Sequence, residues 1–136
     1  MIQPATDRLA TLLRDARTGD ILPPATVDVG GARRLDATAF VLPGSGRLDA
    51  YLAALSGAER DFAAWDGRVV VLGPNRAPRH RLVIVDRYGQ VYDVVEGADA
   101  EVLPSAAALE EWFKFLATAC PECGVIDDPR ERSWTP

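Results

Sequence analysis

The sequence predicts a mixed α/β fold in which one β-sheet is flanked by helices. Short apolar runs alternate with turn-forming residues, which is typical of strands buried inside a sheet. Leucines and aromatic residues recur at helical spacing near both ends of the chain and between two of the apolar runs. A strand, a helix and a strand therefore precede a β-hairpin and a last helix, which implies both parallel and antiparallel neighbours in the sheet.

The first expected element is an amphipathic packing helix within residues 1–18. Thr6 is a suitable N-cap, and Asp7 places a negative charge in the first turn, where the helix dipole favours it. Gly19 then ends the helix. The apolar side of this helix comprises Leu9, Leu12, Leu13 and Ala16.

The next part of the chain predicts a hairpin, a buried strand and a helix. Residues 26–35 contain two short strand-like runs around Gly30-Gly31, which is a turn signal. Residues 38–42 are almost continuously apolar and indicate a strand that is buried on both faces. A loop follows and leads into a helix that begins near Leu48, which Gly57 is expected to interrupt.

The second half predicts three more strands and a closing helix. The strands are indicated by residues 68–72, 82–85 and 90–95. Asp86 to Gly89 is typical of a tight turn, which makes the last two strands an antiparallel hairpin. The closing helix begins with Ser105 as its N-cap and ends at Cys120-Pro121, because a proline cannot continue the backbone hydrogen bonding of a helix.

Length and charge limit the classes of function. A chain of 136 residues is most simply one domain, for which we expect a helix over residues 1–18, a main body over 19–119 and a turn and tail over 120–136. With 15 basic and 20 acidic residues the net charge is −5, which argues against binding nucleic acid through bulk charge. No apolar run approaches the ~18 residues of a membrane span, and no signal peptide is evident, so a cytoplasmic location is expected.

Three local motifs occur in the same order as in a known family. Gly19 to Pro23 holds a glycine and a proline ahead of the first hairpin, residues 39–43 join an apolar strand to a loop proline, and residues 82–91 join two strands by Asp-x-x-Gly. Over residues 19–117 the chain resembles the thioredoxin-like fold, and within it the redoxin branch of peroxiredoxins and alkyl hydroperoxide reductase/thiol-specific antioxidant proteins. The resemblance implies a thioredoxin-like mixed β-sheet with flanking helices and an N-terminal helical extension.

The chain departs from this family where the reacting sulfur would be. In peroxiredoxins a threonine follows the loop proline by four residues and the peroxidatic cysteine by seven, and counted from Pro43 these positions hold Arg47 and Ala50. No CxxC pair follows the strand. Ser45 cannot replace a thiol, because a serine hydroxyl needs a neighbouring base and no histidine partner is evident. Peroxidase activity is therefore not expected.

The two cysteines lie together near the C-terminus, in Cys120-Pro121-Glu122-Cys123. A CxxC pair can close and exchange a disulfide, so Cys120 and Cys123 are the predicted reactive residues of a redoxin-like thiol/disulfide protein. The pair follows a helix, whose C-terminal dipole and the charge of Glu122 both raise a thiol pKa. A redox switch or resolving pair is therefore favoured over a fast thiol-disulfide oxidoreductase, and enzymatic activity stays an open question.

A second interpretation of Cys120 and Cys123 is metal binding. Cys-Pro-x-Cys-Gly is similar to the knuckle of zinc ribbons and rubredoxins, but a structural zinc needs four ligands. His80 with Asp127 and Asp128 could contribute, or two chains could each supply one pair across a homodimer. The chain would then be a non-catalytic interaction module with no other cofactor. A third interpretation is a pair of ordinary thiols or a passive disulfide.

Other residues carry weaker predictions. His80 lies among arginines (Arg76, Arg79, Arg81 and Arg87), which suggests either an anion site or, more simply, a solvated connector. Pro78 is the nearest candidate for the family's cis-proline, and Arg79 or Arg81 for its active-site arginine. Gly44 and Gly46 precede a helix and could present backbone N–H groups to an anion. Trp65 and Trp112 are expected in the core, and Trp134 at a contact with a protein partner or second subunit.

Overall fold

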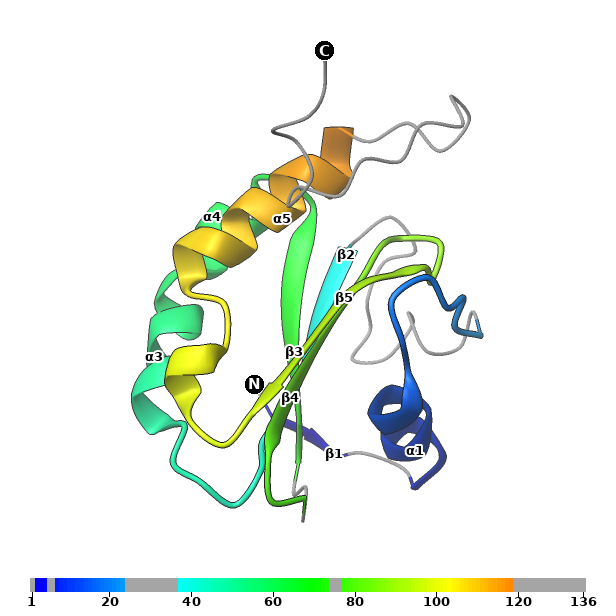
Figure 1. Cartoon of the computed structure of the whole chain (residues 1–136). Coiled ribbons are helices and arrows are strands. Elements are labelled where there is room, and N and C mark those ends of the chain that lie inside the picture. Colours follow the sequence, from blue (N-terminus) through cyan, green and yellow to red (C-terminus); the bar gives the residue numbers. More distant parts are fainter. Residues whose placement is uncertain (1, 5–6, 24–36, 74–76, 119–136) are drawn as a thin grey trace.

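The computed structural model describes residues 2–4, 7–23, 37–73 and 77–118, which form a five-stranded sheet with helices on both faces (Figure 1). The strands are β1 (Ile2–Pro4), β2 (Ala37–Leu42), β3 (Gly67–Gly73), β4 (His80–Val85) and β5 (Val91–Gly97). The helices are α1 (Asp7–Asp15), α3 (Asp49–Gly57), α4 (Glu59–Ala63) and α5 (Ala106–Thr118), with a 3₁₀ turn η2 (Ala100–Val102). The predicted mixed α/β class is thereby confirmed. The predicted hairpin at residues 26–35 lies outside the described part.

The sheet is mixed, in the order β1-β3-β2-β4-β5. The strands β1 and β2 both run parallel to β3, whereas β4 is antiparallel to both β2 and β5. The central strand β2 is buried along its whole length, as its apolar run predicts. Its polar residue, Thr38, is satisfied by a hydrogen bond that Arg68 Nε donates to Thr38 Oγ1 over 2.9 Å.

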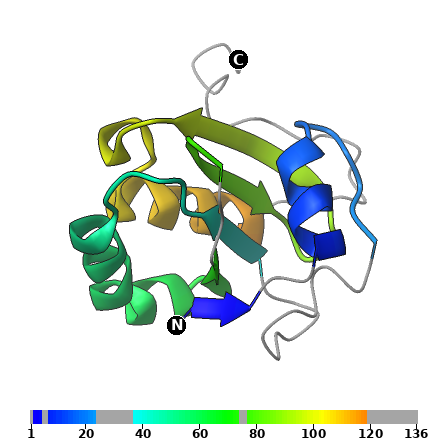
Figure 2. The same ribbon diagram turned by 90° about the horizontal axis from the view of Figure 1, so that it is seen from below.

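Helices lie on both faces of the sheet (Figure 2), and each face has its own apolar core. Successive residues of a strand point to opposite faces, so Phe40 and Val83 face α1 whereas Val41 and Ile84 face the other helices. The α1 side includes Leu9, Leu13, Phe40, Leu72, Val83 and Val85. The side covered by α3, α4 and α5 includes Val41, Leu55, Phe62, Ile84, Leu109 and Phe113. The sheet must therefore be apolar on both faces, which explains its continuous apolar runs.

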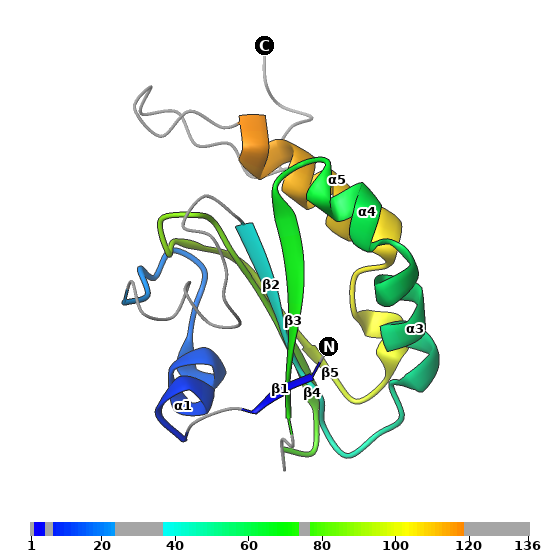
Figure 3. The same cartoon turned by 180° about the vertical axis from the view of Figure 1, so that it is seen from behind.

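The N-terminal residues belong to the sheet. We expected only a helical extension here, but Ile2 pairs with Val71 and places β1 at the edge of the sheet beside β3 (Figure 3). A strand of three residues is too short to show the alternation by which strands are recognised. The helix itself begins at Asp7 as expected, and its residues Leu9 and Leu13 are buried against the sheet.

The helices on the second face follow the sequence closely. Gly57 ends α3, and α4 begins at Glu59, which confirms the predicted interruption. Phe62 of α4 meets Phe113 of α5 edge to face, with ring centroids 5.2 Å apart. Trp112 is buried, as predicted for the core.

Trp65 is only partly buried, and it packs against the same cluster. The nitrogen of Lys114 lies 5.4 Å from the centroid of its ring.

The turn between β4 and β5 forms as the Asp-x-x-Gly motif predicts. Asp86 Oδ1 accepts hydrogen bonds from the backbone N–H groups of Tyr88 (2.8 Å) and Gln90 (2.9 Å). Gly89 has φ +89°, a left-handed conformation that glycine adopts without steric cost. No helix within the described ranges is long and apolar enough to cross a lipid bilayer.

Candidate functional site

The site suggested by the family resemblance lies at one end of the sheet. There β2 ends at Leu42 and residues 43–48 lead into α3, while residues 77–79 lead into β4. Because β4 is antiparallel to β2, the end of one strand and the start of the other lie at the same edge. Figure 2 views the molecule from this end. The two loops meet there, and His80 lies at their junction.

His80 is fully buried and holds the two loops together. Its Nδ1 accepts a hydrogen bond from the backbone N–H of Gly44 over 2.7 Å. Since Nδ1 accepts, the N–H of the ring is assigned to Nε2, and this nitrogen is buried without a partner among the described residues. The expectation of a solvated connector is wrong for this residue. The signal was present in the sequence, since His80 is in phase with the buried Leu82 and Ile84.

Two glycines make this close packing possible. A Cβ on Gly44 would lie 2.5 Å from the carbonyl carbon of Arg79, which is closer than real Cβ contacts come. A Cβ on Gly46 would lie 3.0 Å from His80 Nε2 and 3.1 Å from the carbonyl oxygen of Ala98. Because both glycines lack a Cβ, the loop can pack directly against the imidazole ring and the backbone of Arg79. We had considered them as anion donors, but the N–H of Gly44 is already used by His80.

The loop after β2 provides no activated nucleophile. Ser45 donates a hydrogen bond from Oγ to the carbonyl oxygen of Pro78 at 3.4 Å, so its hydroxyl is not paired with the imidazole. The positions that the redoxin resemblance would assign to a threonine and to the peroxidatic cysteine hold Arg47 and Ala50. The first turn of α3 carries the negative charge of Asp49. The loop therefore packs on a buried histidine and contains neither a thiol nor an activated hydroxyl group.

The arginines around His80 do not form one site with it. His80 and Arg81 are neighbours in β4 and point to opposite faces of the sheet. Arg81 faces α1 and donates hydrogen bonds to the carbonyl oxygens of Leu13 (2.8 Å) and Ala16. Arg87 lies at the far end of β4, with its guanidinium 5.0 Å from the ring centroid of Tyr88. Arg81 and Arg87 therefore do not form an anion site with the imidazole, and Arg76 lies outside the described residues.

The predicted reactive pair, Cys120 and Cys123, lies outside the described residues, as do Asp127, Asp128 and Trp134. The structure does show where the chain leaves the last helix. Leu116 and Ala117 of α5 line a small pocket with Ala37, Trp65, Asp66 and Arg87. Ala37 begins β2, so α5 ends at the opposite end of the sheet from the loop after β2 (Figure 1).

Two tyrosines have raised pKa values for structural reasons. Burial raises the pKa of Tyr51 to about 12, and its hydroxyl donates a 2.6 Å hydrogen bond to the carbonyl oxygen of Pro104. Burial also raises the pKa of Tyr92, and the nearby charge of Asp86 raises it further. Both rings pack in the core on the α5 side. We assign them no chemical role.

The described part of the chain contains no group of three or more His, Cys, Asp or Glu residues that could hold a metal ion. The Nδ1 of His80 is occupied by the N–H of Gly44, and its ring is buried at the other end of the sheet from the end of α5. Because the cysteines lie outside the described residues, a contribution of His80 to a zinc site stays a prediction. Comparison of the chain with protein-family models, curated proteins and solved structures found no match.

Proposed function

We propose that the chain is a redoxin-like protein of the thioredoxin-like fold whose thiol–disulfide chemistry belongs to Cys120 and Cys123. The strand order and directions support the fold assignment: a parallel set of β1, β3 and β2 is extended by the antiparallel hairpin of β4 and β5. The arrangement of helices also fits this fold, with α1 on one face and α3, α4 and α5 on the other. These features resemble the fold that the motifs in the sequence imply.

The observation that carries the functional proposal is the separation of the two ends of the sheet. The loop after β2 is sealed by the hydrogen bond between Gly44 and His80 and contains no sulfur. Leu116 and Ala117, in the last turn of α5, line a pocket with Ala37 and Arg87. The helix ends at Thr118, two residues before Cys120 in the sequence. In the sequence, Cys120 and Cys123 follow the last residue of α5, and the end of α5 lies at the opposite end of the sheet from the loop after β2.

The proposed reaction exchanges one disulfide for another. A thiolate of the reduced pair attacks a sulfur of a disulfide on a protein or small-molecule partner, and the second sulfur of that disulfide leaves as a thiolate. The other cysteine of the pair then attacks the mixed disulfide. It releases the partner's remaining sulfur and forms the Cys120–Cys123 bond. Two electrons pass to the partner and its two sulfurs take up two protons, so the pair is oxidised and the partner is reduced.

The position of the pair after a helix argues for a slow switch. The C-terminal end of a helix carries partial negative charge, which disfavours a thiolate, and Glu122 adds a formal charge between the two thiols. Catalytic CxxC pairs instead begin a helix, where the dipole stabilises the thiolate. We therefore expect Cys120 and Cys123 to change reversibly between thiols and a disulfide as a redox switch, and to exchange disulfides slowly.

The test is mass spectrometry after thiol alkylation of the native, metal-free and reduced protein. Oxidised protein should take up no label, and reduction with dithiothreitol should expose both of the two cysteines in the chain. Cys120→Ser and Cys123→Ser should each leave one thiol that is labelled regardless of dithiothreitol. Two thiols that never form a disulfide, even with an added disulfide oxidant, would contradict the proposal.

The same experiment distinguishes zinc binding. If a zinc ion joins the pairs of two chains, the native protein holds about half an equivalent of zinc per chain, because four ligands come from two pairs. Removal of the metal would then expose the thiols without any reductant and convert a dimer into monomers. This result would replace the redox proposal with a non-catalytic interaction module.

A further inference from the structure

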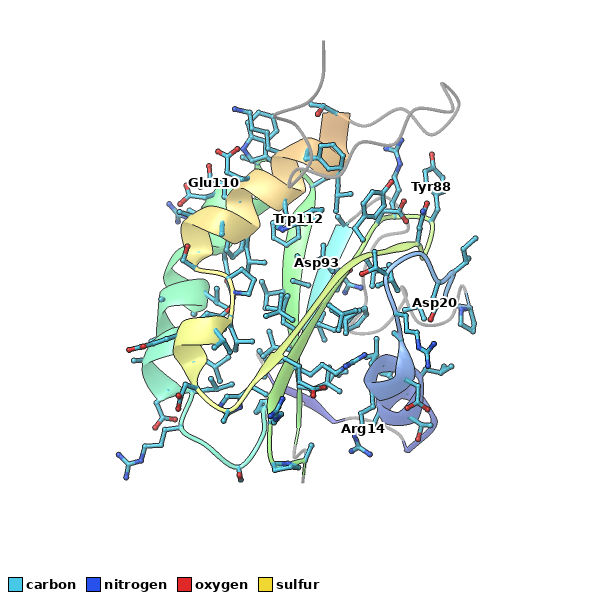
Figure 4. All side chains as sticks on the ribbon, in the orientation of Figure 1. Arg14, Asp20, Tyr88, Asp93, Glu110 and Trp112 are labelled. Atoms are coloured by element: carbon cyan, nitrogen blue, oxygen red, sulfur yellow. The ribbon has the colours of Figure 1, made fainter. Side chains whose placement is uncertain are left out.

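The loop after β2 is anchored at both ends and is held loosely between them. Leu42 before the loop and Leu48 at its end are buried, whereas residues 45–47 are exposed. No apolar side chain of residues 43–47 belongs to either core. Trp112, by contrast, points from α5 toward the sheet and is buried there (Figure 4). Movement of residues 43–47 away from the sheet would therefore expose little apolar surface.

Two hydrogen bonds hold residues 43–47 within the described part of the chain. The backbone N–H of Gly44 donates to His80 Nδ1 over 2.7 Å. The hydroxyl of Ser45 donates to the carbonyl oxygen of Pro78 over 3.4 Å, which is long for a hydrogen bond and lies at the surface. The start of α3 adds no attachment, because Leu48 at its N-cap makes no side-chain capping bond. The bond from Gly44 to His80 is therefore the main attachment.

The closed loop leaves one polar atom of His80 without a partner. The ring is completely buried, and its Nε2 makes no hydrogen bond with the described residues. A buried donor that stays unpaired costs at least as much stability as one hydrogen bond contributes. If the loop moves outward, water can reach Nε2 and this cost is removed. The unpaired nitrogen therefore offsets much of what the bond from Gly44 contributes.

Gly46 lies directly against this unpaired nitrogen. A Cβ built on Gly46 would lie 3.0 Å from His80 Nε2 and 3.1 Å from the carbonyl oxygen of Ala98. The loop therefore fits against the ring only because this residue has no side chain. Gly46 and Ala98 are both exposed, so movement of Gly46 away from Ala98 would open a path from solvent to Nε2.

We propose that residues 43–47 form a lid over His80, which opens and closes while the rest of the fold stays intact. The hydrogen bond from Gly44 to His80 closes the lid, and Leu42 and Leu48 are its fixed ends. Local opening is expected where buried apolar contacts are few and the hydrogen bonds lie near the surface. The open lid exposes the imidazole of the only histidine in the chain, so it controls the access of solutes to that ring. The lid is independent of the proposed thiol chemistry, since residues 43–47 contain no cysteine.

Native-state hydrogen exchange of the full chain tests this proposal at the amide of Gly44. We expect this amide to exchange at least about a hundredfold faster than the amide of Phe40 in β2, yet more slowly than an unprotected amide. Low concentrations of urea should accelerate exchange at Phe40 and leave the rate at Gly44 unchanged, because local opening exposes little surface.

The single histidine provides a chemical measurement of the same opening. Diethyl pyrocarbonate acylates an accessible imidazole nitrogen, and mass spectrometry of the peptide that contains His80 gives the rate. We expect the folded protein to be acylated more slowly than the urea-unfolded chain, in proportion to the fraction of open lid.

Gly46→Ala should shift the lid toward its open state. The ring of His80 is buried and the carbonyl oxygen of Ala98 belongs to the backbone, so the loop is the part that can yield to the added Cβ. Exchange at Gly44 and acylation of His80 should both rise about tenfold or more, as expected for an overpacked position. Gly57→Ala is the matched control, because its Cβ would meet nothing within 4 Å. It should leave both rates within about twofold of the wild type.

Equal exchange rates at Gly44 and Phe40, with the same dependence on urea, would overturn the proposal, because the loop would then open only when the whole protein unfolds. An unprotected amide at Gly44 would overturn it as well, since no closed lid would then be populated. If Gly46→Ala raised exchange at Gly44 without raising the acylation of His80, the lid would not control access to the ring.

Discussion

At the scale of single residues, the tightest contact in the candidate site is that between Gly44 and the backbone of Arg79. Gly44→Ala should destabilise the protein by about 1–3 kcal/mol, because a Cβ there would meet backbone atoms at 2.5 to 2.8 Å, which cannot move aside as a flexible side chain can. The same shift should lengthen the hydrogen bond to His80. Urea unfolding measures the loss of stability.

Gly57 provides the matched control. A Cβ on Gly57 would meet nothing within 4 Å, and the residue ends a helix. Gly57→Ala should therefore be neutral or stabilise the protein by up to about 1 kcal/mol, since alanine has less conformational freedom to lose. Equal destabilisation by both substitutions would show that the loop after β2 is not closely packed on Arg79.

Tyr51 predicts how stability depends on alkaline pH. Its pKa rises from 10.0 to about 12 in the folded protein. Below pH 10 the phenol is neutral in the folded and unfolded states, so its contribution to stability is complete. Between pH 10 and about pH 12 the unfolded state ionises first, so the free energy of unfolding falls across this interval.

Tyr51→Phe should flatten this alkaline loss of stability. At neutral pH the variant should lose about 1 kcal/mol, because the hydrogen bond to the carbonyl oxygen of Pro104 is removed. Tyr88→Phe alters an exposed ring and is the control. Urea unfolding at pH 8 and pH 11 gives both quantities, and identical pH profiles for the wild type and Tyr51→Phe would contradict the assignment.

At the scale of elements, Arg81 joins α1 to the sheet. Its guanidinium donates one hydrogen bond to the carbonyl oxygen of Leu13, near the C-terminal end of α1, and another to that of Ala16, just after the helix. The positive charge of Arg81 also complements the negative end of the helix dipole. Arg81→Lys keeps the charge but loses the fork that reaches both carbonyls. We expect a loss of about 1.5–3 kcal/mol, which is the range for hydrogen bonds to charged groups.

Hydrogen exchange shows whether that loss is local. In Arg81→Lys the amides of α1 should exchange faster, while those of α5 should keep their wild-type rates. Arg87→Lys changes an arginine of the β4–β5 turn and should leave both helices unaffected. If the amides of α1 and α5 exchanged equally faster in Arg81→Lys, the loss of the hydrogen bonds between Arg81 and α1 would not explain the loss of stability.

The elements were also the scale at which the sequence was most informative. Continuous apolar runs predicted β2, β3 and β4, because a strand that is covered on both faces carries apolar side chains on both sides. Gly57 predicted the break between α3 and α4 because glycine weakens a helix. The strand β1 was not predicted, because three residues are too few to show an alternation of apolar and polar side chains. Its pairing with β3 is a tertiary contact, which the local sequence does not indicate.

The candidate site was less predictable because it depends on distances across the chain. His80 and Gly44 are 36 residues apart, and only the antiparallel pairing of β2 with β4 brings them to the same edge. Grouping arginines by sequence failed for a related reason: neighbouring residues of a strand face opposite sides, which separates Arg81 from His80.

At the scale of the whole molecule, the sheet separates two regions. One end holds the loop after β2, which the hydrogen bond between Gly44 and His80 closes, and the other holds the end of α5 and the turn that contains Arg87. This separation is the basis of the functional proposal. A disulfide that forms or breaks beyond α5 should change the environment of residues near that end and leave the loop after β2 unaltered.

The most direct test compares backbone amide NMR spectra of the chain in dithiothreitol and after oxidation. We predict chemical-shift changes in the last turn of α5 and around Arg87, with Gly44, Gly46 and His80 unchanged. Cys120→Ser, Cys123→Ser and the double variant should show none of these changes. Shifts centred on Gly44 and His80, or identical spectra for the wild-type protein in the two conditions, would contradict the account.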